Sequence, residues 1–320
     1  MSSHSPTPLS RIKFKFLAYV RELRVKQWTK NLIVFAAPLF AFNFTDRSLS
    51  GSLLAFSLFC CASSSFYLIN DIIDVESDRL HPVKCQRPIA AGSIGISEAI
   101  IVAVILLGGA ASIGYWKSVG LGTAISGYAL LQVAYNLKLK HKIIVDVLAI
   151  ATGFVLRALG GAAATGIVLS HWFILCTAML ALFLGIEKRK AELRLSEIKG
   201  RKSRAVLHRY SLPLLIRMES VVTNGTIIFY AIWSSGPTFK GASTSWMMLT
   251  IPFVLYGIFR YQLLSDPQEI ARTNPQLEQG GKTERPEEIL LGDRPLLLTT
   301  IGWICTVFAV QLSYKLQWIY

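Results

Sequence analysis

The sequence predicts an all-helical membrane protein, a polytopic bundle of about nine transmembrane helices. Of its 320 residues, 52% are hydrophobic and only 16% are charged, and the mean hydropathy is +0.47. Such a composition is typical of integral membrane proteins and not of soluble domains. Long apolar stretches with short polar breaks, and a very uneven distribution of Lys and Arg over those breaks, point the same way. We expect one domain, residues 1–320.

Nine apolar stretches approach the length of about 20 residues with which a helix crosses a bilayer core of about 30 Å. They are residues 29–46, 49–70, 95–115, 118–137, 143–165, 171–187, 220–236, 245–264 and 296–316. The first and the seventh are the least regular, because each begins in a charged, amphipathic stretch. Residues 1–28 are expected to form an amphipathic cytoplasmic segment, and residues 265–295, rich in Pro, Gly, Glu and Gln, a cytoplasmic loop.

Lys and Arg gather on one side of this predicted topology. The amino-terminal segment and the breaks after the second, fourth, sixth and eighth spans carry 28 of the 33 basic residues, whereas the opposite side carries 4. By the positive-inside rule, the amino terminus and these breaks are cytoplasmic in a multi-pass protein of the cell (inner or plasma) membrane. The net charge of +14 then reflects topology and attraction to anionic membrane lipids, and nucleic-acid binding is not expected.

The stretch NDIIDVESD, residues 70–78, is the most informative part of the chain. With about 100° of turn per residue, Asp71, Asp74 and Asp78 would share one acidic face of a helix. Mg²⁺ relieves the repulsion between such charges, because it binds one or two carboxylates and completes its shell with water and phosphate oxygens. The pattern therefore predicts a magnesium site for a diphosphate. The alternative interpretation is a solvated polar helix end.

Two further breaks hold cations that suit phosphate. Tyr135 and Lys140 follow the fourth span, and we expect them to hold phosphate oxygens at the mouth of the bundle. Anchoring of the topology by the lysines of that break is the alternative. Lys188 and Arg189 follow the sixth span and would hold additional phosphate directly.

Acidic residues flank the second of these breaks, within the block EKRKAEL. Glu187 or Glu192 remains open as a metal ligand there. Arg157 is an ionisable residue in the middle of an apolar span, and such residues usually face the interior of a bundle and have partners. Structural pairing and substrate contact are both open for it. Lys30 and Asn31 are candidates for the site if the first span lines the mouth, and interfacial anchoring is their alternative role.

Several of these motifs resemble those of one superfamily of membrane enzymes. The string NDxxDxxxDxxHPxKxxRPIAAG, residues 70–92, resembles the first Asp-rich motif of the intramembrane prenyltransferase (UbiA) superfamily. The stretch YxxxLK at 135–140 resembles the motif that its members carry after their fourth span. The other stretches that add to the resemblance are RVKQWTKN (24–31), Arg157 with Ala158, EKRKAEL (187–193), Ile251-Pro252-Phe253, Arg260-Tyr261 and PEEILLGDR (286–294). Together they resemble the decaprenyl-phosphate phosphoribosyltransferase branch of the superfamily.

The resemblance implies a UbiA-like bundle with its active-site mouth on the cytoplasmic side and Mg²⁺ as cofactor. It implies transfer of 5-phosphoribose from 5-phosphoribosyl 1-diphosphate to a polyprenyl phosphate, with release of diphosphate, for synthesis of a cell-envelope polysaccharide precursor. The implied catalytic residues are Asp71, Asp74, Asp78 and Arg87, of which the three Asp also bind the metal. The implied substrate-binding residues are Lys30, Asn31, Asn70, His81, Lys84, Tyr135, Lys140, Arg157, Lys188, Arg189 and Glu192.

Two other functions remain as alternatives. An aromatic-acceptor prenyltransferase would join a prenyl diphosphate to a ring such as 4-hydroxybenzoate, but the members of the superfamily with that activity carry a second Asp-rich motif where this chain has EKRKAEL. An ion-coupled transporter would place its carboxylates near the bilayer midplane, whereas the Asp cluster here lies at the end of a span. The length of the lipid and the oligomeric state, with an oligomer possible, stay open.

Overall fold

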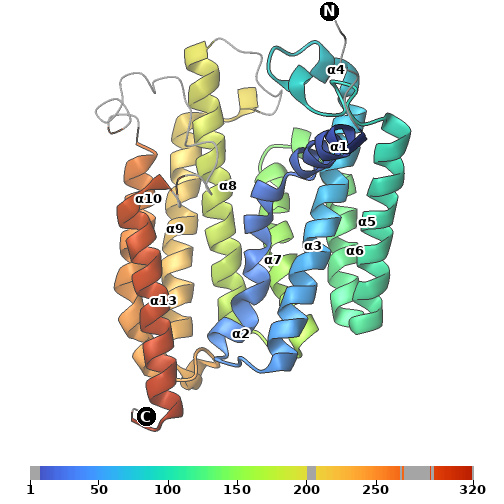
Figure 1. The fold of residues 1–320 in the computed structure, drawn as a ribbon. Coiled ribbons are helices and arrows are strands. Elements are labelled where there is room, and N and C mark those ends of the chain that lie inside the picture. The colour runs from blue at the N-terminus through green and yellow to red at the C-terminus, as the bar shows by residue number, and fades with distance from the viewer. Residues whose placement is uncertain (1–7, 200–206, 267–268, 270–288, 290–291, 319–320) are drawn as a thin grey trace, which may run out of the picture.

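The computed structural model describes residues 8–199, 207–266, 269, 289 and 292–318. Within these residues every regular element is a helix, and there is no strand. The long helices stand side by side as an upright bundle, with α1 and α4 at one end and α2 at the other (Figure 1). The predicted all-helical membrane bundle is confirmed.

The chain forms short helices between the long ones. The first half contains α1 (Pro8–Glu22), η1 (Val25–Phe35), α2 (Ala36–Phe40), α3 (Asp46–Ile73), α4 (Val75–Arg79), η2 (Lys84–Gln86), α5 (Ile96–Lys117), α6 (Val119–Leu137) and η3 (Leu139–His141). The second half contains α7 (Val145–Thr165), α8 (His171–Lys199), η4 (Leu207–Arg209), α9 (Leu212–Ser234), η5 (Pro237–Phe239), η6 (Ser245–Thr250), α10 (Ile251–Leu264) and α13 (Arg294–Lys315).

Seven helical segments of the described chain are long and apolar enough to cross a membrane. They are Asp46–Ile73, Ile96–Lys117, Val145–Thr165, His171–Arg194, Leu212–Ser234, Ser245–Leu264 and Arg294–Lys315. The two expected spans outside this set are 29–46 and 118–137. The second of them is α6, whose Thr, Ser, Gln and Asn side chains lower its mean hydropathy. The total of nine therefore stays a prediction.

The first expected span forms two short helices instead of one long one. Its residues 29–40 belong to η1, a 3₁₀ helix of 11 residues, and to α2, an α-helix of 5 residues, and residues 41–45 lie outside any helix. At rises of about 2.0 Å and about 1.5 Å per residue, the two together extend about 30 Å. This length matches the hydrocarbon core of a bilayer, at about 30 Å.

The long helices begin and end at residues suited to those positions. Thr45, Ser118, Ser211 and Asp293 precede α3, α6, α9 and α13, and each side chain accepts a hydrogen bond from a backbone N–H of the first turn. Gly166 ends α7 with φ of 74°, a left-handed conformation that glycine adopts without steric cost. Local sequence therefore fixes where these helices turn back.

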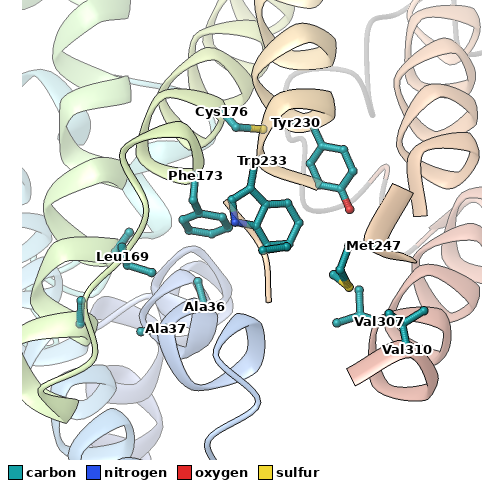
Figure 2. Close-up of a cluster of buried hydrophobic side chains, with 13 residues drawn as sticks. Ala36, Ala37, Leu169, Phe173, Cys176, Tyr230, Trp233, Met247, Val307 and Val310 are labelled. Atoms are coloured by element: carbon teal, nitrogen blue, oxygen red, sulfur yellow. The ribbon is translucent and has the colours of Figure 1, made fainter. Parts of the chain in front are cut away.

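A cluster of buried aromatic and aliphatic side chains closes the end of the bundle that contains α2 (Figure 2). The ring of Phe40 lies 4.6 Å from that of Phe173 and 4.9 Å from that of Trp233, between ring centroids. The hydroxyl of Tyr230 accepts a hydrogen bond from the indole of Trp303 at 2.8 Å. Because apolar packing fills this end, the buried charges lie elsewhere in the bundle.

Glycines on α7 allow η1 and α3 to pack closely against this helix. A Cβ atom at Gly161 would lie 2.1 Å from the carbonyl oxygen of Val34 in η1. A Cβ atom at Gly160 would lie 2.5 Å from the ring of Phe59 in α3. Both distances are far shorter than any van der Waals contact, so only glycine permits this packing.

We expect Gly161→Ala to lower the free energy of unfolding by about 1–3 kcal/mol, because the new methyl group has to push η1 away from α7. Gly127→Ala is the matched control, since its Cβ atom would meet only a flexible Leu156 methyl at 3.6 Å. Thermal unfolding in detergent measures both. Equal midpoints for the two variants would contradict the close approach of η1 and α7.

Candidate functional site

Helices α1 and α4 lie at one end of the bundle (Figure 1), and most of the buried charged side chains come from elements that reach this end. The alternating course of the chain brings the end of α3, the end of α6, the start of α7 and the second half of α8 to this end. We distinguish four groups: the Asp71 cluster (Glu22, Arg24, Asp71, Asp78, Lys84, Arg87), the Arg157 cluster (Asn31, Tyr128, Arg157), the Arg189 cluster (Tyr135, Asp146, Arg189, Glu192, Tyr210) and the Lys190 cluster (Glu187, Lys190, Glu219, Gln262).

The Asp71 cluster is organised around one guanidinium group. Nη1 of Arg87 donates to Oδ1 of Asp71 at 2.8 Å and to Oδ2 of Asp78 at 2.6 Å. Asp71 and Asp78 are only 3% and 1% exposed. Nη2 of Arg24 reaches both oxygens of Asp71, at 2.6 and 2.9 Å, and Nζ of Lys84 lies 3.6 Å from Oδ1 of Asp78. Two buried carboxylates thus meet three cations.

The third aspartate of the motif, Asp74, is not part of this buried group. Helix α3 ends at Ile73, and Asp74 has non-helical backbone angles before α4 begins at Val75. This break turns Asp78 back toward Asp71 and leaves Asp74 exposed. The structure therefore brings together Asp71 and Asp78 but not Asp74, which differs from the expected single helical face of three.

The loop after α4 carries Arg87 and is shaped by its own side chains. Nδ1 of His81 accepts hydrogen bonds from the backbone N–H groups of Val83 and Lys84, both at 3.2 Å. Gly92 takes φ of 75° where the loop turns toward α5. Asn70 is half-buried one residue before Asp71. In this conformation His81 shapes the loop through Nδ1, and Asn70 adjoins the cluster.

Glu22, the last residue of α1, belongs to the same cluster and was not among the residues expected from the sequence. It is 2% exposed and lies near Asp71. Burial and the neighbouring carboxylate of Asp71 raise the pKa of Glu22 to about 8. The chain then reverses at Arg24, which has a left-handed conformation with φ of 51° and stacks over the ring of Tyr67. This turn places both Glu22 and Arg24 near Asp71.

The oxygens of the Asp71 cluster suit Mg²⁺, which prefers carboxylate ligands. Oδ1 of the buried Asp78 and Oε1 of the buried Glu22 have no hydrogen-bond partner among the described residues. No three acidic, His or Cys side chains within that part of the chain are already arranged to hold a metal ion. Arg87 lies between the two aspartates instead, so their oxygens suit the ion by their chemistry while a guanidinium group is bound to both of them.

The Arg157 cluster lies deeper in the bundle. Nε of Arg157 donates to Asn31 at 2.6 Å, Nη2 donates to the hydroxyl of Tyr128 at 3.0 Å, and Nη1 donates to the carbonyl of Gly153 at 2.9 Å. These contacts satisfy every nitrogen of the guanidinium group and join α7 to η1 and α6. Lys30, next to Asn31, donates to Gln27 at 2.5 Å. Two roles were left open for Arg157, and its contacts in this structure are those of structural pairing.

The Arg189 cluster is a buried network of long-range contacts. Nε of Arg189 donates to Asp146 at 2.8 Å, and its two other nitrogens donate to Glu192 and, at 3.3 Å, to Tyr135. The hydroxyl of Tyr210 donates to Asp146 at 2.7 Å, and burial together with that carboxylate raises the pKa of Tyr210. Arg189 is 0% exposed, and all its nitrogens have protein partners in this conformation.

The Lys190 cluster has the same character. Lys190 donates to Glu187 at 2.7 Å and to Glu219, and Gln262 donates to Glu219 at 2.8 Å. These residues come from α8, α9 and α10. The block EKRKAEL therefore lies within α8, which continues to Lys199, and two of its three cations are buried against acids. Lys188 of this block and Lys140 on η3 are half-buried.

Two of the motifs that are far apart in the sequence, Arg260-Tyr261 and PEEILLGDR, are joined by an ion pair. Arg260 of α10 donates from Nε and Nη2 to the carboxylate of Asp293, at 3.2 and 2.9 Å. This ion pair and the backbone N–H of Leu296 lower the pKa of Asp293. Residues 286–288, 290 and 291 of the PEEILLGDR stretch lie outside the described residues.

Sequence reasoning missed Glu22, Arg24, Asp146, Tyr210 and Glu219 as members of these clusters. Glu22 and Arg24 lie in a basic amphipathic stretch that reads as a surface segment. Asp146 carried a signal, because it is a single acid at the start of an apolar span. For Glu219, the expected span began at residue 220, whereas α9 begins at Leu212 and includes it.

The chain is similar to known proteins along most of its length. Residues 32–277 match the UbiA prenyltransferase family. A decaprenyl-phosphate phosphoribosyltransferase of Mycolicibacterium smegmatis is 36% identical over 304 residues, which is 91% of this chain and 91% of that protein. One of Mycobacterium tuberculosis is 37% identical over 297 residues, 91% of this chain and 93% of that protein.

A solved structure has the same arrangement of helices. A UbiA homolog from Archaeoglobus fulgidus, bound to GPP and Mg²⁺, superposes with a TM-score of 0.67 at 20% identity and covers 92% of this chain and 99% of its own. At this identity the likeness concerns the fold. The family match and the two relatives, together with the polar end built on Asp71 and Arg87, show that the chain is an enzyme, a membrane transferase that belongs to the UbiA prenyltransferase family.

Proposed function

We propose that the protein transfers 5-phosphoribose from 5-phosphoribosyl 1-diphosphate to a decaprenyl-type polyprenyl phosphate and releases diphosphate. The product would be a precursor of cell-envelope polysaccharide. The relatives of M. smegmatis and M. tuberculosis are named for a decaprenyl-phosphate phosphoribosyltransferase activity, which supports this choice within the family.

One observation carries the proposal: the Asp71 cluster combines buried carboxylates with cations in a single group. Asp71 and Asp78 offer oxygen ligands for Mg²⁺, and Arg24, Lys84 and Arg87 surround them with positive charge. A diphosphate bound together with a divalent cation needs both kinds of group, since carboxylates would hold the ion and cationic side chains would bind phosphate oxygens.

The residues of the cluster then have distinct roles. Bound Mg²⁺ would supply neutralisation of the diphosphate as it leaves ribose C1. Asp71 and Asp78 would hold the ion, and Arg87, released from its bridge, would donate to the departing diphosphate together with Lys84. The exposed Asp74 stays a candidate ligand only through a rearrangement of the short turn between α3 and α4.

The acceptor needs no strong general base. The phosphate of the lipid is already an anion, and it attacks the oxocarbenium-like C1 from the face opposite to the diphosphate, so the configuration at C1 inverts. Lys140 and Lys188, half-buried beside the mouth, are the proposed partners of the lipid phosphate or the 5-phosphate. We assign Arg189 a positioning role, because Asp146, Glu192 and Tyr135 already occupy its nitrogens.

We expect purified protein to move label from 5-phosphoribosyl 1-diphosphate into extractable polyprenyl phosphate, with EDTA abolishing the transfer. Asp71→Asn should reduce it by about a hundredfold or more, because a carboxylate that holds the ion next to the leaving group is lost. Asp46→Asn, on the exposed far end of α3, is the matched control and should retain full activity.

Either of two results would overturn the proposal. The first is transfer that persists undiminished in Asp71→Asn or in EDTA. The second is absence of phosphoribosyl transfer together with turnover of a prenyl diphosphate and 4-hydroxybenzoate, which would assign the aromatic-acceptor activity instead.

Arg189→Met tests the positioning role of that arginine. Because it leaves Asp146 buried without its cation, we expect a loss of stability of about 3–5 kcal/mol, and the double variant with Asp146→Asn should recover a large part of it. Lys188→Met is the neighbouring control and should change stability by less than about 1 kcal/mol. Thermal unfolding measures all three. If Arg189→Met kept wild-type stability and lost only affinity for the donor, direct phosphate binding by Arg189 would replace our assignment.

The proposed orientation places the Asp71 cluster on the cytoplasmic face. Cys85, in the loop after α4, should then resist a membrane-impermeant maleimide in intact cells and react after permeabilisation. In a Cys85→Ser background, Lys240→Cys at the opposite end of the bundle should react in intact cells. Reaction of Cys85 before permeabilisation would reverse the orientation.

A further inference from the structure

Helix α1 has two faces that differ in burial. Ala18 and Glu22 are 8% and 2% exposed, whereas Phe16, Leu17 and Val20 are 66%, 56% and 37% exposed. At about 100° of turn per residue, the three exposed apolar side chains fall within an arc of about 100° on the side of α1 opposite to the two buried ones. The outward face of α1 is therefore apolar, and no part of the described chain covers it.

The contacts of α1 place it at the boundary of the bilayer core. Ala18 packs in one buried cluster with Leu68 of α3 and Ala99 of α5. Nζ of Lys15 lies 2.9 Å from the carboxylate of Glu98, which belongs to the first turn of α5. Helices α3 and α5 are both candidate membrane spans, so α1 lies at the level where one ends and the other begins. Figure 1 shows α1 at this end of the bundle.

The segment that carries this apolar face is positively charged. Helix α1 contains four basic residues, Arg11, Lys13, Lys15 and Arg21. Its single acid, Glu22, is buried and does not offset them at the surface. Arg21 and, after the helix, Lys26 are exposed. A helix with an apolar face and basic polar residues lies in the interface of an anionic membrane, with its apolar face about 5–10 Å into the boundary between headgroups and acyl chains.

The inward face of α1 supports the part of the chain that carries the Asp71 cluster. The buried cluster that contains Ala18 also contains Val75 of α4 and Ile89 of the loop after α4. Two residues after the end of α1, Arg24 donates to Asp71 at 2.6 Å. Whatever holds α1 against α3 therefore also holds α4 and this loop in place.

We propose that the outward face of α1 inserts into the headgroup region of an anionic lipid leaflet, and that this lipid surface keeps α4 and the loop after it ordered. Phe16 and Leu17 enter the boundary of the hydrocarbon, and Arg21 and Lys26 meet the phosphate groups of the lipids. The inference goes beyond the proposed function, because the partner is the membrane surface and not a substrate.

A second copy of the chain fits this face less well than lipid does. Two copies that paired through α1 would bring two basic segments together, and like charges repel. An anionic leaflet carries the opposite charge, and it is present at the level where α1 lies.

The first test measures the depth of residue 16 in nanodiscs of phosphatidylcholine, with and without phosphatidylglycerol. An environment-sensitive NBD label is attached to Phe16→Cys in a Cys85→Ser, Cys305→Ser background, and label on that background alone is subtracted. Glu76→Cys, at an exposed position of α4, is the matched control. We expect brominated lipid chains to quench the label at residue 16 several-fold more than the label at residue 76, and to do so less when phosphatidylglycerol is omitted.

Either of two results of this test would overturn the proposal. The first is equal quenching at residues 16 and 76 in the anionic nanodiscs. The second is a label at residue 16 that is shielded from water but not quenched by the lipid, because a protein surface would then cover it.

The second test measures order next to the site by amide hydrogen exchange over residues 75–94. We expect this exchange to be about tenfold slower in the anionic nanodiscs than in phosphatidylcholine alone, and Phe16→Ser combined with Leu17→Ser should remove the difference. Val168→Ser is the matched control and should keep it, since it changes a 93% exposed apolar residue between α7 and α8. Equal exchange in the two lipids, or a difference that survives in the Phe16 and Leu17 variant, would contradict the proposal.

Neither measurement uses the donor or the acceptor. Absence of phosphoribosyl transfer would therefore refute the proposed function alone, and the contrary results named above would refute the inference alone.

Discussion

Two buried carboxylates can share one end of this bundle because a single guanidinium group lies between them. Asp71 and Asp78 are almost inaccessible to solvent, and a buried charge without a partner costs about 3–5 kcal/mol. Arg87 donates from one nitrogen to both. The break between α3 and α4 brings Asp78 close to Asp71. The loop after α4 then brings Arg87 to both aspartates, so both segments have the conformation that this bridge requires.

The same constraint accounts for the order of the helices around the site. Arg157 of α7 is paired with η1 and α6, Arg189 of α8 with α7, and Lys190 of α8 with α9. Apolar packing alone is weakly directional in lipid, where tails and side chains are equally apolar. A buried charge is different, because only a particular register gives it a partner. The charged clusters therefore select this arrangement from the many that small residues and leucines permit.

Sequence patterns predict the parts of this structure that depend on local chemistry. The long helices follow from apolar runs with Thr45, Ser118 and similar residues before them, and the interior position of Arg157 follows from its place in an apolar span. Helical periodicity placed Asp74 with Asp71, and that failed because the helix ends at Ile73 and periodicity carries no information across a break.

The contacts between distant segments were beyond reach for another reason. Glu22 and Asp71 are separated by η1, α2 and most of α3, and Asp146 and Arg189 belong to two different helices. Nothing in either sequence neighbourhood specifies the other. From the sequence alone, Glu22 in its basic stretch is expected on the surface. The turn at Arg24, which directs the chain back to α3, is not evident from the sequence.

The block EKRKAEL shows that a run of positively charged residues in the sequence need not give a positively charged site in the structure. Its three adjacent cations suggest direct phosphate binding, yet Arg189 and Lys190 are each buried between acids, Asp146 and Glu192 for the first and Glu187 and Glu219 for the second. Four carboxylates thus face these two cations, so neither Arg189 nor Lys190 has positive charge to spare for a phosphate. Positive charge available to a substrate lies instead at the Asp71 cluster, where three cations meet two buried aspartates, and on the half-buried lysines that flank the mouth. In the proposed function, the donor diphosphate binds beside α3 and α4, and the ion pairs of Arg189 and Lys190 hold α7, α8 and α9 together.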